Sequence, residues 1–274
     1  MRLNSLIRKI HKFAGKESLS GEESLRIIER FFNLSEILAE RSKIKILENN
    51  ELLKEIPRDI FSFEEPHPYQ MSGSPYGTTS PFFLRSGVVD RLLKAQQKLD
   101  SERPGFKLHI FDGFRPISVQ EYMVDYTFRK YASEAGLNPD SISELDSDRI
   151  MKKVLSVWAM PNRDPISPPP HSTGAVVDLS ILGVDGKQLM MGSDFDEPSD
   201  RILPHFYSNA KDDHGKVCHS NRELLLNVMK FAGFARLTHE WWHFCYGDQM
   251  WALLEGIKNQ TLETPLSACY AAVD

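Results

Sequence analysis

Residues 171–181 of the 274-residue chain, HSTGAVVDLSI, combine a β-strand pattern with a charged side chain. The apolar run over 175–181 predicts a strand, and Asp178 lies inside it. A buried carboxylate needs a cation or strong hydrogen-bond donors to offset the loss of water. His171 follows three prolines, which keep the backbone before it extended, and Gly174 permits a turn between the two. Either a metal ion bound by His171 and Asp178, or an arginine paired with Asp178, would satisfy the carboxylate.

A second polar segment, HEWWH at residues 239–243, has the spacing of the H-E-x-x-H motif. On a helix, this spacing places both histidines on one face as zinc ligands and leaves the glutamate as a general base. The aromatic neighbours, with Gly233 before and Gly247 after the segment, favour a strand instead. In a strand, a turn or bulge must bring Glu240 and His243 to one site. The pattern alone leaves open a helical zinc motif, a strand-borne site and a pair without metal.

A third segment, DGFRP at residues 112–116, follows a predicted strand over 106–111, in which apolar and polar residues alternate. Arg115 lies between the end of this strand and Pro116, and a residue before proline is disfavoured in helical backbone. An arginine at such a point either anchors nearby carbonyl groups or stabilises an anion at the strand end.

The remaining pattern predicts an α+β fold, with helices and strands segregated rather than strictly alternating. Residues 1–55 are charged and carry apolar residues at helical spacing, so we expect an N-terminal helical extension with helices at 22–32 and 37–53. A loop rich in Pro, Gly and Ser at 65–81 follows, and we place the main domain at 56–274. In this domain we expect helices at 88–99, 117–135, 145–158 and 222–231, and strands at 106–111, 175–181 and 241–246.

The composition is that of a folded globular protein, with 41% hydrophobic and 26% charged residues. A formal net charge of −5 argues against a general nucleic-acid binder, which normally carries a basic surplus. No stretch approaches 18 consecutive apolar residues, and the N-terminal segment lacks the apolar region of a secretory signal. Three cysteines without a CxxC pair indicate no disulfide framework. We therefore expect a cytoplasmic protein without nucleic-acid or membrane partners; the sequence assigns no oligomeric state.

Taken in order, the three segments resemble the D-Ala-D-Ala dipeptidase family, the group that includes the vancomycin-resistance dipeptidases. The family signature is D-x-[FY]-R-P, then H-x(6)-D, then E-x-W-H, and it is found here at residues 112–116, 171–178 and 240–243. A further match is M-G-x-x-F-D at 191–196, and the resemblance covers about residues 70–250. It implies the fold that zinc D,D-peptidases share with the hedgehog signalling domain, with a central antiparallel sheet flanked by helices.

The resemblance also implies a metal centre. His171, Asp178 and His243 would bind one Zn²⁺ ion, and three ligands leave an open position for water, as catalytic zinc requires. Glu240 would be the general base that takes the proton of this water and passes it to the leaving amine. His239 would be a neighbour of the site and not a ligand.

Three more residues are carried over as substrate contacts. Arg115 would stabilise the tetrahedral intermediate, Asp196 would hold the free amine of the substrate, and Tyr76 begins the loop associated with binding the dipeptide. The chain departs from the family pattern at Pro169, where many relatives have serine, and at Pro81, where asparagine is usual. Both departures lie in parts associated with the dipeptide, so the implied metal chemistry is unaffected by them.

The predicted function is hydrolysis of D-Ala-D-Ala, or of a closely related D,D-dipeptide from peptidoglycan chemistry. One alternative is a D,D- or L,D-carboxypeptidase of the same fold acting on a longer peptidoglycan peptide. Another is a zinc-bearing binding module without turnover. Asp196 favours the dipeptidase, because a group that holds a free amine suits a short substrate. Glu240 and Arg115 argue against the binding module, because neither is needed to hold zinc.

Overall fold

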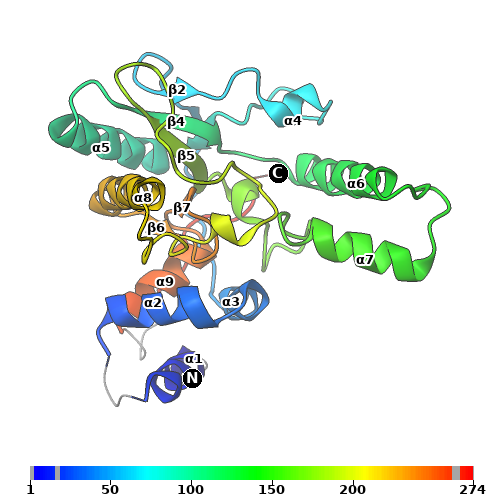
Figure 1. The fold of residues 1–274 in the computed structure, drawn as a ribbon, viewed down its shortest axis with the longest axis horizontal. Coiled ribbons are helices and arrows are strands. Elements are labelled where there is room, and N and C mark those ends of the chain that lie inside the picture. The colour runs from blue at the N-terminus through cyan, green and yellow to red at the C-terminus, as the bar shows by residue number, and fades with distance from the viewer. Residues whose placement is uncertain (1–2, 16–18, 261–265, 274) are drawn as a thin grey trace.

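A five-stranded sheet in the order β2-β4-β5-β7-β6 carries the fold (Figure 1). The computed structural model describes residues 3–15, 19–260 and 266–273. Strand β5 pairs antiparallel with β4 and β7, and β6 pairs antiparallel with β7, whereas β2 is parallel to β4. A separate antiparallel pair joins β1 to β3. The strands are β1 (Leu53–Glu55), β2 (Ser62–Phe63), β3 (Phe83–Arg85), β4 (Lys107–Asp112), β5 (Val176–Leu182), β6 (Ala235–Arg236) and β7 (His243–Cys245).

Helices cover the sheet and extend beyond one end of it. Figure 1 shows α5 beside α8, and α6 beside α7, as two packed pairs. Among the described residues, no helix is both long and apolar enough to span a bilayer. The α-helices are α1 (Leu3–Ala14), α2 (Gly21–Phe31), α3 (Leu34–Arg41), α4 (Pro68–Met71), α5 (Ser86–Glu102), α6 (Ile117–Glu134), α7 (Glu144–Val154), α8 (Asp213–Phe231) and α9 (Gln249–Lys258), and two 3-10 turns are η1 (Pro170–Thr173) and η2 (Asp200–Ile202).

The two faces of the sheet pack against different helices. Along β5, Val177, Leu179 and Ile181 belong to a first core that includes α5 and α8. Val176 belongs to a second core, formed with α9 and the N-terminal helices. This division follows from the strand itself, because successive side chains point to opposite faces. Asp178 therefore lies on the same face as Val176, away from the first core.

The N-terminal helices are part of the second core. Leu6 and Ile10 of α1, Ile28 of α2 and Ile37 of α3 are buried there together with apolar residues of α9. Both α2 and α3 pack directly against α9. The division of the chain at residue 55 stays a prediction, but the apolar surface of these helices is shared with the rest of the protein.

The α+β class and the central, mainly antiparallel sheet are confirmed, and the parallel strand β2 is an addition to the expected topology. The expected helix over 37–53 is wrong beyond Arg41. The segment after it pairs with the C-terminal part of the chain instead, since the Leu47 N–H donates to the Ala268 carbonyl at 2.8 Å. Tertiary pairing thus overrides a helical pattern of apolar residues. Helix α8 begins earlier than expected, at Asp213, because the Asp212 side chain caps it.

We expect Ile28→Ala to lower the free energy of unfolding of the whole protein by about 2–5 kcal/mol, because it leaves a cavity in a shared core. Urea unfolding followed by circular dichroism measures this change. Leu52→Ala is the control, since Leu52 is 80% exposed and its loss should change the free energy by less than about 0.5 kcal/mol. A first transition confined to the N-terminal helices, with the rest unaffected, would contradict a shared core.

Candidate active site

Three strands place one polar residue each in a row across the sheet. Asp178 of β5 is directly opposite Asp112 of β4 on one side and His243 of β7 on the other. Directly opposite residues of paired strands point to the same face. A register shift between Ile110 and Asp112 marks an irregularity that changes the direction of β4 at its end. Strand pairing thus gathers two carboxylates and an imidazole that are far apart in the sequence.

His171 reaches this row from the η1 turn. The turn ends at Gly174, whose φ of 67° is a left-handed conformation that glycine adopts without strain. The Ser172 hydroxyl donates to the Arg115 carbonyl at 2.8 Å, and the Val273 N–H donates to the Ser172 carbonyl at 2.8 Å. The turn that carries His171 is therefore held between the segment after β4 and the C-terminal part of the chain.

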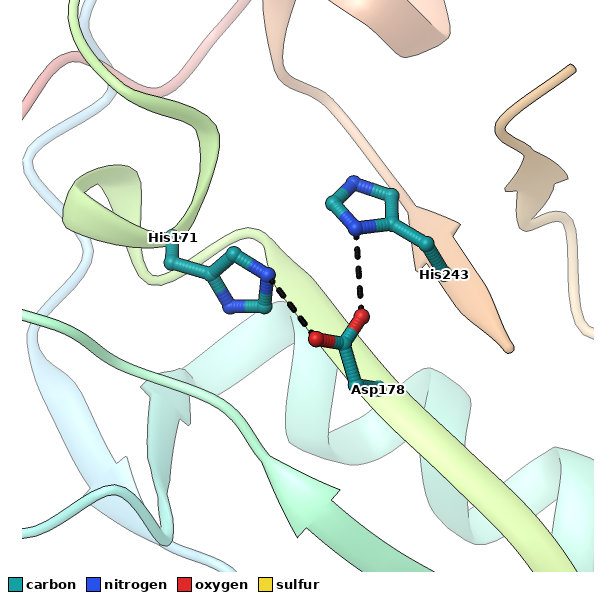
Figure 2. A group of neighbouring side chains, drawn as sticks. All are labelled: His171, Asp178 and His243. Carbon is teal, nitrogen blue, oxygen red and sulfur yellow. Dashed lines mark ion pairs between the residues drawn. The ribbon is translucent and has the colours of Figure 1, made fainter. Parts of the chain in front are cut away.

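Figure 2 shows the rings of His171 and His243 directed at the two carboxylate oxygens of Asp178. Nε2 of His171 lies 3.2 Å from Oδ2, and Nδ1 of His243 lies 3.1 Å from Oδ1. All three side chains are buried. Burial alone would raise the pKa of Asp178, but the two histidines outweigh it and hold that pKa below its ordinary value. Asp178 is therefore an anion.

The tautomer of His171 is fixed by its second ring nitrogen. Nδ1 lies 2.7 Å from the Gly113 carbonyl oxygen, which only accepts, so Nδ1 carries the proton and donates it. Nε2 then faces Oδ2 of Asp178 at 3.2 Å, where either a proton or a metal ion can link the two atoms. Oδ1 of Asp178 and Nε2 of His243 have no hydrogen-bond partner among the described residues. One ligand atom from each residue lies within 4.8 Å of the others, so the group can hold a metal ion.

Glu240 lies beside this centre, in the turn before β7. Its Oε2 is 3.4 Å from Nδ1 of His243. Burial raises the pKa of Glu240 to about 7, against the charge of His243, which lowers it. A carboxyl group with a pKa near neutrality is suited to accept and return a proton.

Arg115 presents a fixed positive charge to the same space. Its Nε donates to Oδ2 of Asp112 at 3.0 Å, Nη2 contacts the same oxygen, and Nη1 donates to Oε1 of Gln120 at 2.8 Å. The rings of Tyr69 and Trp158 pack on the guanidinium at 5.0 and 4.9 Å. Burial alone would lower the pKa of Arg115, but the charge of Asp112 outweighs it and raises that pKa. These contacts use three of the five N–H groups of the guanidinium, and the Tyr76 hydroxyl is a further partner of Arg115.

Asp196 completes the set of charged groups. The Tyr69 hydroxyl donates to its Oδ2 at 2.5 Å, and burial raises the pKa of Asp196 to about 6. Its backbone has a φ of 53°, in the left-handed region that aspartate tolerates better than most residues. Tyr76 lies elsewhere: its hydroxyl is 3.5 Å from Oδ1 of Asp112.

A cavity of about 300 Å³ opens onto these groups. This volume is at the lower end of the range of roughly 300–1,000 Å³ that is typical of small-molecule sites. Tyr76 is absent from the lining, so its hydroxyl supports Asp112 from behind. The ionisable side chains that line the cavity are Arg115, His171, Asp178, Asp196, Glu240 and His243.

Comparison with known proteins identifies the family of this chain. The family model described as D-ala-D-ala dipeptidase matches residues 63–265. The chain belongs to the D-Ala-D-Ala dipeptidase family. The match confirms both the resemblance inferred from the signature segments and the predicted class of enzyme, a dipeptidase.

Individual relatives of the family are similar over most of their own length. A D-alanyl-D-alanine dipeptidase from Synechocystis sp. is 40% identical over 194 residues, which cover 69% of this chain and 78% of the relative. One from Enterococcus faecium is 26% identical over 166 residues, which cover 59% of this chain and 72% of the relative. Among solved structures, the LdcB LD-carboxypeptidase overlaps at a TM-score of 0.41 and 19% identity, covering 79% of this chain and 76% of its own.

In this member of the family, the H-E-x-x-H segment is not a helical zinc motif. Residues 239–242 form a turn ahead of β7. Both ring nitrogens of His239 are used elsewhere: Nε2 donates to the Phe32 carbonyl at 2.9 Å, and Nδ1 lies 2.8 Å from Oγ1 of Thr238. His239 is thus a neighbour of the site, as expected, and faces the N-terminal helices.

Several residues that shape the site were not predicted from the sequence. Asp112 stood in the quoted signature without a role, although a carboxylate three residues before Arg115 is a natural partner for it. Gln120 lies in the first turn of α6, and nothing in the sequence pointed to it except that it follows Arg115 by five residues. Tyr69 lies in the expected loop and Trp158 at the end of an expected helix. No sequence pattern there indicates that their rings pack on Arg115.

We expect Asp112→Asn to lower the free energy of unfolding by about 3–5 kcal/mol, because it leaves the buried charge of Arg115 without its partner. Urea titration measures the change. Asp140→Asn is the matched control: Asp140 also pairs with an arginine, Arg129, but both side chains are exposed, so the loss should be about 0–1 kcal/mol. Equal effects of the two substitutions would show that Arg115 does not depend on Asp112.

Proposed function

We propose that the protein is a mononuclear zinc dipeptidase that hydrolyses D-Ala-D-Ala or a closely related D,D-dipeptide. The observation that carries the metal centre is the convergence of His171, Asp178 and His243, whose ligand atoms all lie within 4.8 Å of one another. Two imidazoles and one carboxylate are a donor set that suits zinc, and three protein ligands leave a position free for catalysis. His171, Asp178 and His243 are the proposed ligands.

The hydrogen bond from His171 Nδ1 to the Gly113 carbonyl supports the same assignment. Metal-bound histidines usually donate their other ring N–H to a carbonyl or carboxylate, which fixes the ring orientation. The chemistry that zinc supplies in such a site is polarisation of the scissile carbonyl and a lower pKa for a water molecule.

Glu240 is the proposed general base. Its carboxylate adjoins His243 and lines the cavity, so a water molecule there is within reach of Oε2. Glu240 takes a proton from this water and later delivers it to the nitrogen of the leaving amino acid. The second carboxylate near the centre, Asp178, is occupied by two histidines and is unsuited to this task.

Arg115 is the proposed stabiliser of the negative charge that develops on the carbonyl oxygen. Its guanidinium is held by Asp112 and Gln120 before substrate arrives, so no reorganisation is needed during the reaction. Preorganised donors of this kind typically lower the activation barrier by about 3–4 kcal/mol. Asp196 is the proposed partner of the substrate's ammonium group, because it is a carboxyl group on the cavity wall that neither the metal nor an arginine engages.

The metal assignment predicts different zinc contents for two single substitutions. The protein purified with zinc should contain one ion per chain, and Asp178→Ala should contain none and be inactive. His239→Ala should keep most of its zinc, because losing a residue outside the ligand set costs at most about 10–100-fold in affinity. Elemental analysis after dialysis measures the ratio. Zinc lost from His239→Ala and kept in Asp178→Ala would overturn the assignment of ligands.

The substrate assignment predicts that zinc-loaded protein releases alanine from D-Ala-D-Ala and cleaves N-acetyl-D-Ala-D-Ala about 100-fold more slowly, because acetylation removes the charge that Asp196 pairs with. Chromatographic detection of free alanine measures both rates. Glu240→Gln, which should keep its zinc and lose activity about 10²–10⁴-fold, is the inactive control. Faster cleavage of the acetylated peptide would favour a carboxypeptidase, and zinc binding without any cleavage would favour a binding module.

The remaining expectations accompany this proposal. A small peptide is the substrate, and a cytoplasmic location without nucleic-acid or membrane partners stays a prediction from the sequence.

A further inference from the structure

Helix α3, which lies outside the residues matched by the family, is fastened to the segments that carry the candidate ligands. Arg41, at the end of α3, is buried, and its Nη2 donates to the Pro168 carbonyl at 3.0 Å, three residues before His171. At the other end, the Phe32 carbonyl accepts a hydrogen bond from His239, which immediately precedes Glu240. The helix is thus tied to both loops on either side of the site.

The same helix forms part of the cavity wall. Leu34, Ser35 and Leu38 line the cavity of about 300 Å³ that contains the candidate ligands. Leu38 follows Ser35 by three residues and Leu34 by four, so both lie beside Leu38 on the surface of α3. Leu34 and Leu38 also pack against the second core, so this face is shared between core and cavity.

The wall around α3 is apolar. Leu34 and Leu38 are joined there by Leu237, Met250, Leu155 and Met160. Leu155 and Met160 are 38% and 59% exposed, so apolar surface at the cavity is left uncovered by the protein itself. A cavity with charged groups on one part of its wall and uncovered apolar surface on another fits a substrate with a polar backbone and an apolar side chain.

The position of Asp196 indicates which end of a dipeptide faces this wall. Asp196 and Trp158 also line a second cavity, between α4 and α6, to which no residue of α3 contributes. In Figure 1, α4 lies level with β2, at the top of the sheet, and α3 lies below the sheet. If Asp196 holds the amine, the carboxyl-terminal residue of the dipeptide extends toward α3.

We propose that α3 determines specificity, and that Leu34 and Leu38 receive the side chain of the carboxyl-terminal residue, so that D,D-dipeptides ending in a larger aliphatic residue are preferred over D-Ala-D-Ala. The inference rests on the proposed function for the orientation of the substrate. Each methylene buried against such a wall changes binding by about 4-fold, so leucine in place of alanine should gain at least about 10-fold.

The test compares kcat and KM for D-Ala-D-Leu and D-Ala-D-Ala in the full zinc-loaded chain. Leu38→Ala should lower the preference for D-Ala-D-Leu about 10-fold, measured as the kcat/KM of D-Ala-D-Leu divided by that of D-Ala-D-Ala. Leu25→Ala is the matched control, since Leu25 packs against the same second core from α2 but lines a different cavity. Leu25→Ala should leave the ratio of the kcat/KM values for the two substrates unchanged.

A second variant adds bulk instead of removing it. Ser35 is exposed and lines the cavity, so Ser35→Trp should fold and should exclude D-Ala-D-Leu more strongly than D-Ala-D-Ala. Ala39→Trp, also exposed on α3 but outside the cavity lining, is its control. A substrate ratio that responds to neither Leu38→Ala nor Ser35→Trp, in an active enzyme, overturns the role of α3 and leaves the proposed function intact.

If the unsubstituted protein cleaves neither peptide, a binding measurement still tests the role of α3 separately from the proposed dipeptidase activity. Calorimetry with the zinc-loaded Glu240→Gln protein should show D-Ala-D-Leu binding about 10-fold more tightly than D-Ala-D-Ala, with the difference lost when Leu38→Ala is added. This result without turnover by the unsubstituted protein would support α3 as a specificity wall and reject the dipeptidase. Equal binding of the two peptides, or binding of neither, would reject the specificity wall.

Discussion

The buried carboxylate of Asp178 is the constraint on which the rest of the site depends. An anion in the middle of an apolar strand is unfavourable unless positive charge or strong donors surround it. The register of β5 with β7 supplies His243, and the η1 turn supplies His171. The first core on the other face of β5 keeps the strand in place, because Val177 and Leu179 are fully buried there. The apolar residues thus hold the strand in place, and its one charged residue, Asp178, faces the two histidines.

A second buried charge balances the first. Arg115 lies at the end of β4, beside the strand that carries Asp178, and Asp112 neutralises it within the same row of the sheet. The two centres are joined through backbone, since the Arg115 carbonyl accepts from Ser172 and the Gly113 carbonyl accepts from His171. The five residues 112–116, which begin at the last residue of β4, therefore position a cation and orient an imidazole together.

Sequence alone predicted the parts of the site that lie within short segments. His171, Asp178 and His243 were carried over from the family resemblance, which rests on three short signature segments; the local patterns alone left open whether these residues bind a metal. The wall formed by Leu34 and Leu38 was not found, since their contact with residues beyond 230 depends on how α3 packs against α9. The helix expected over 37–53 failed for the same reason, because a distant segment pairs with its second half. Tyr76 was associated with substrate by its loop, whereas its hydroxyl faces Asp112, which no local pattern shows.

The hydrogen bond from Val273 to the turn that carries His171 has a consequence for biosynthesis. A chain that emerges from the ribosome in order presents His171 and Asp178 first, and two such ligands are too few for a stable zinc site. His243 follows 65 residues after Asp178, and Val273, which donates to Ser172, follows later still. Contacts of such long sequence separation form late in folding. The proposed ligands can therefore come together only after His243 and the segment around Val273 have both been made.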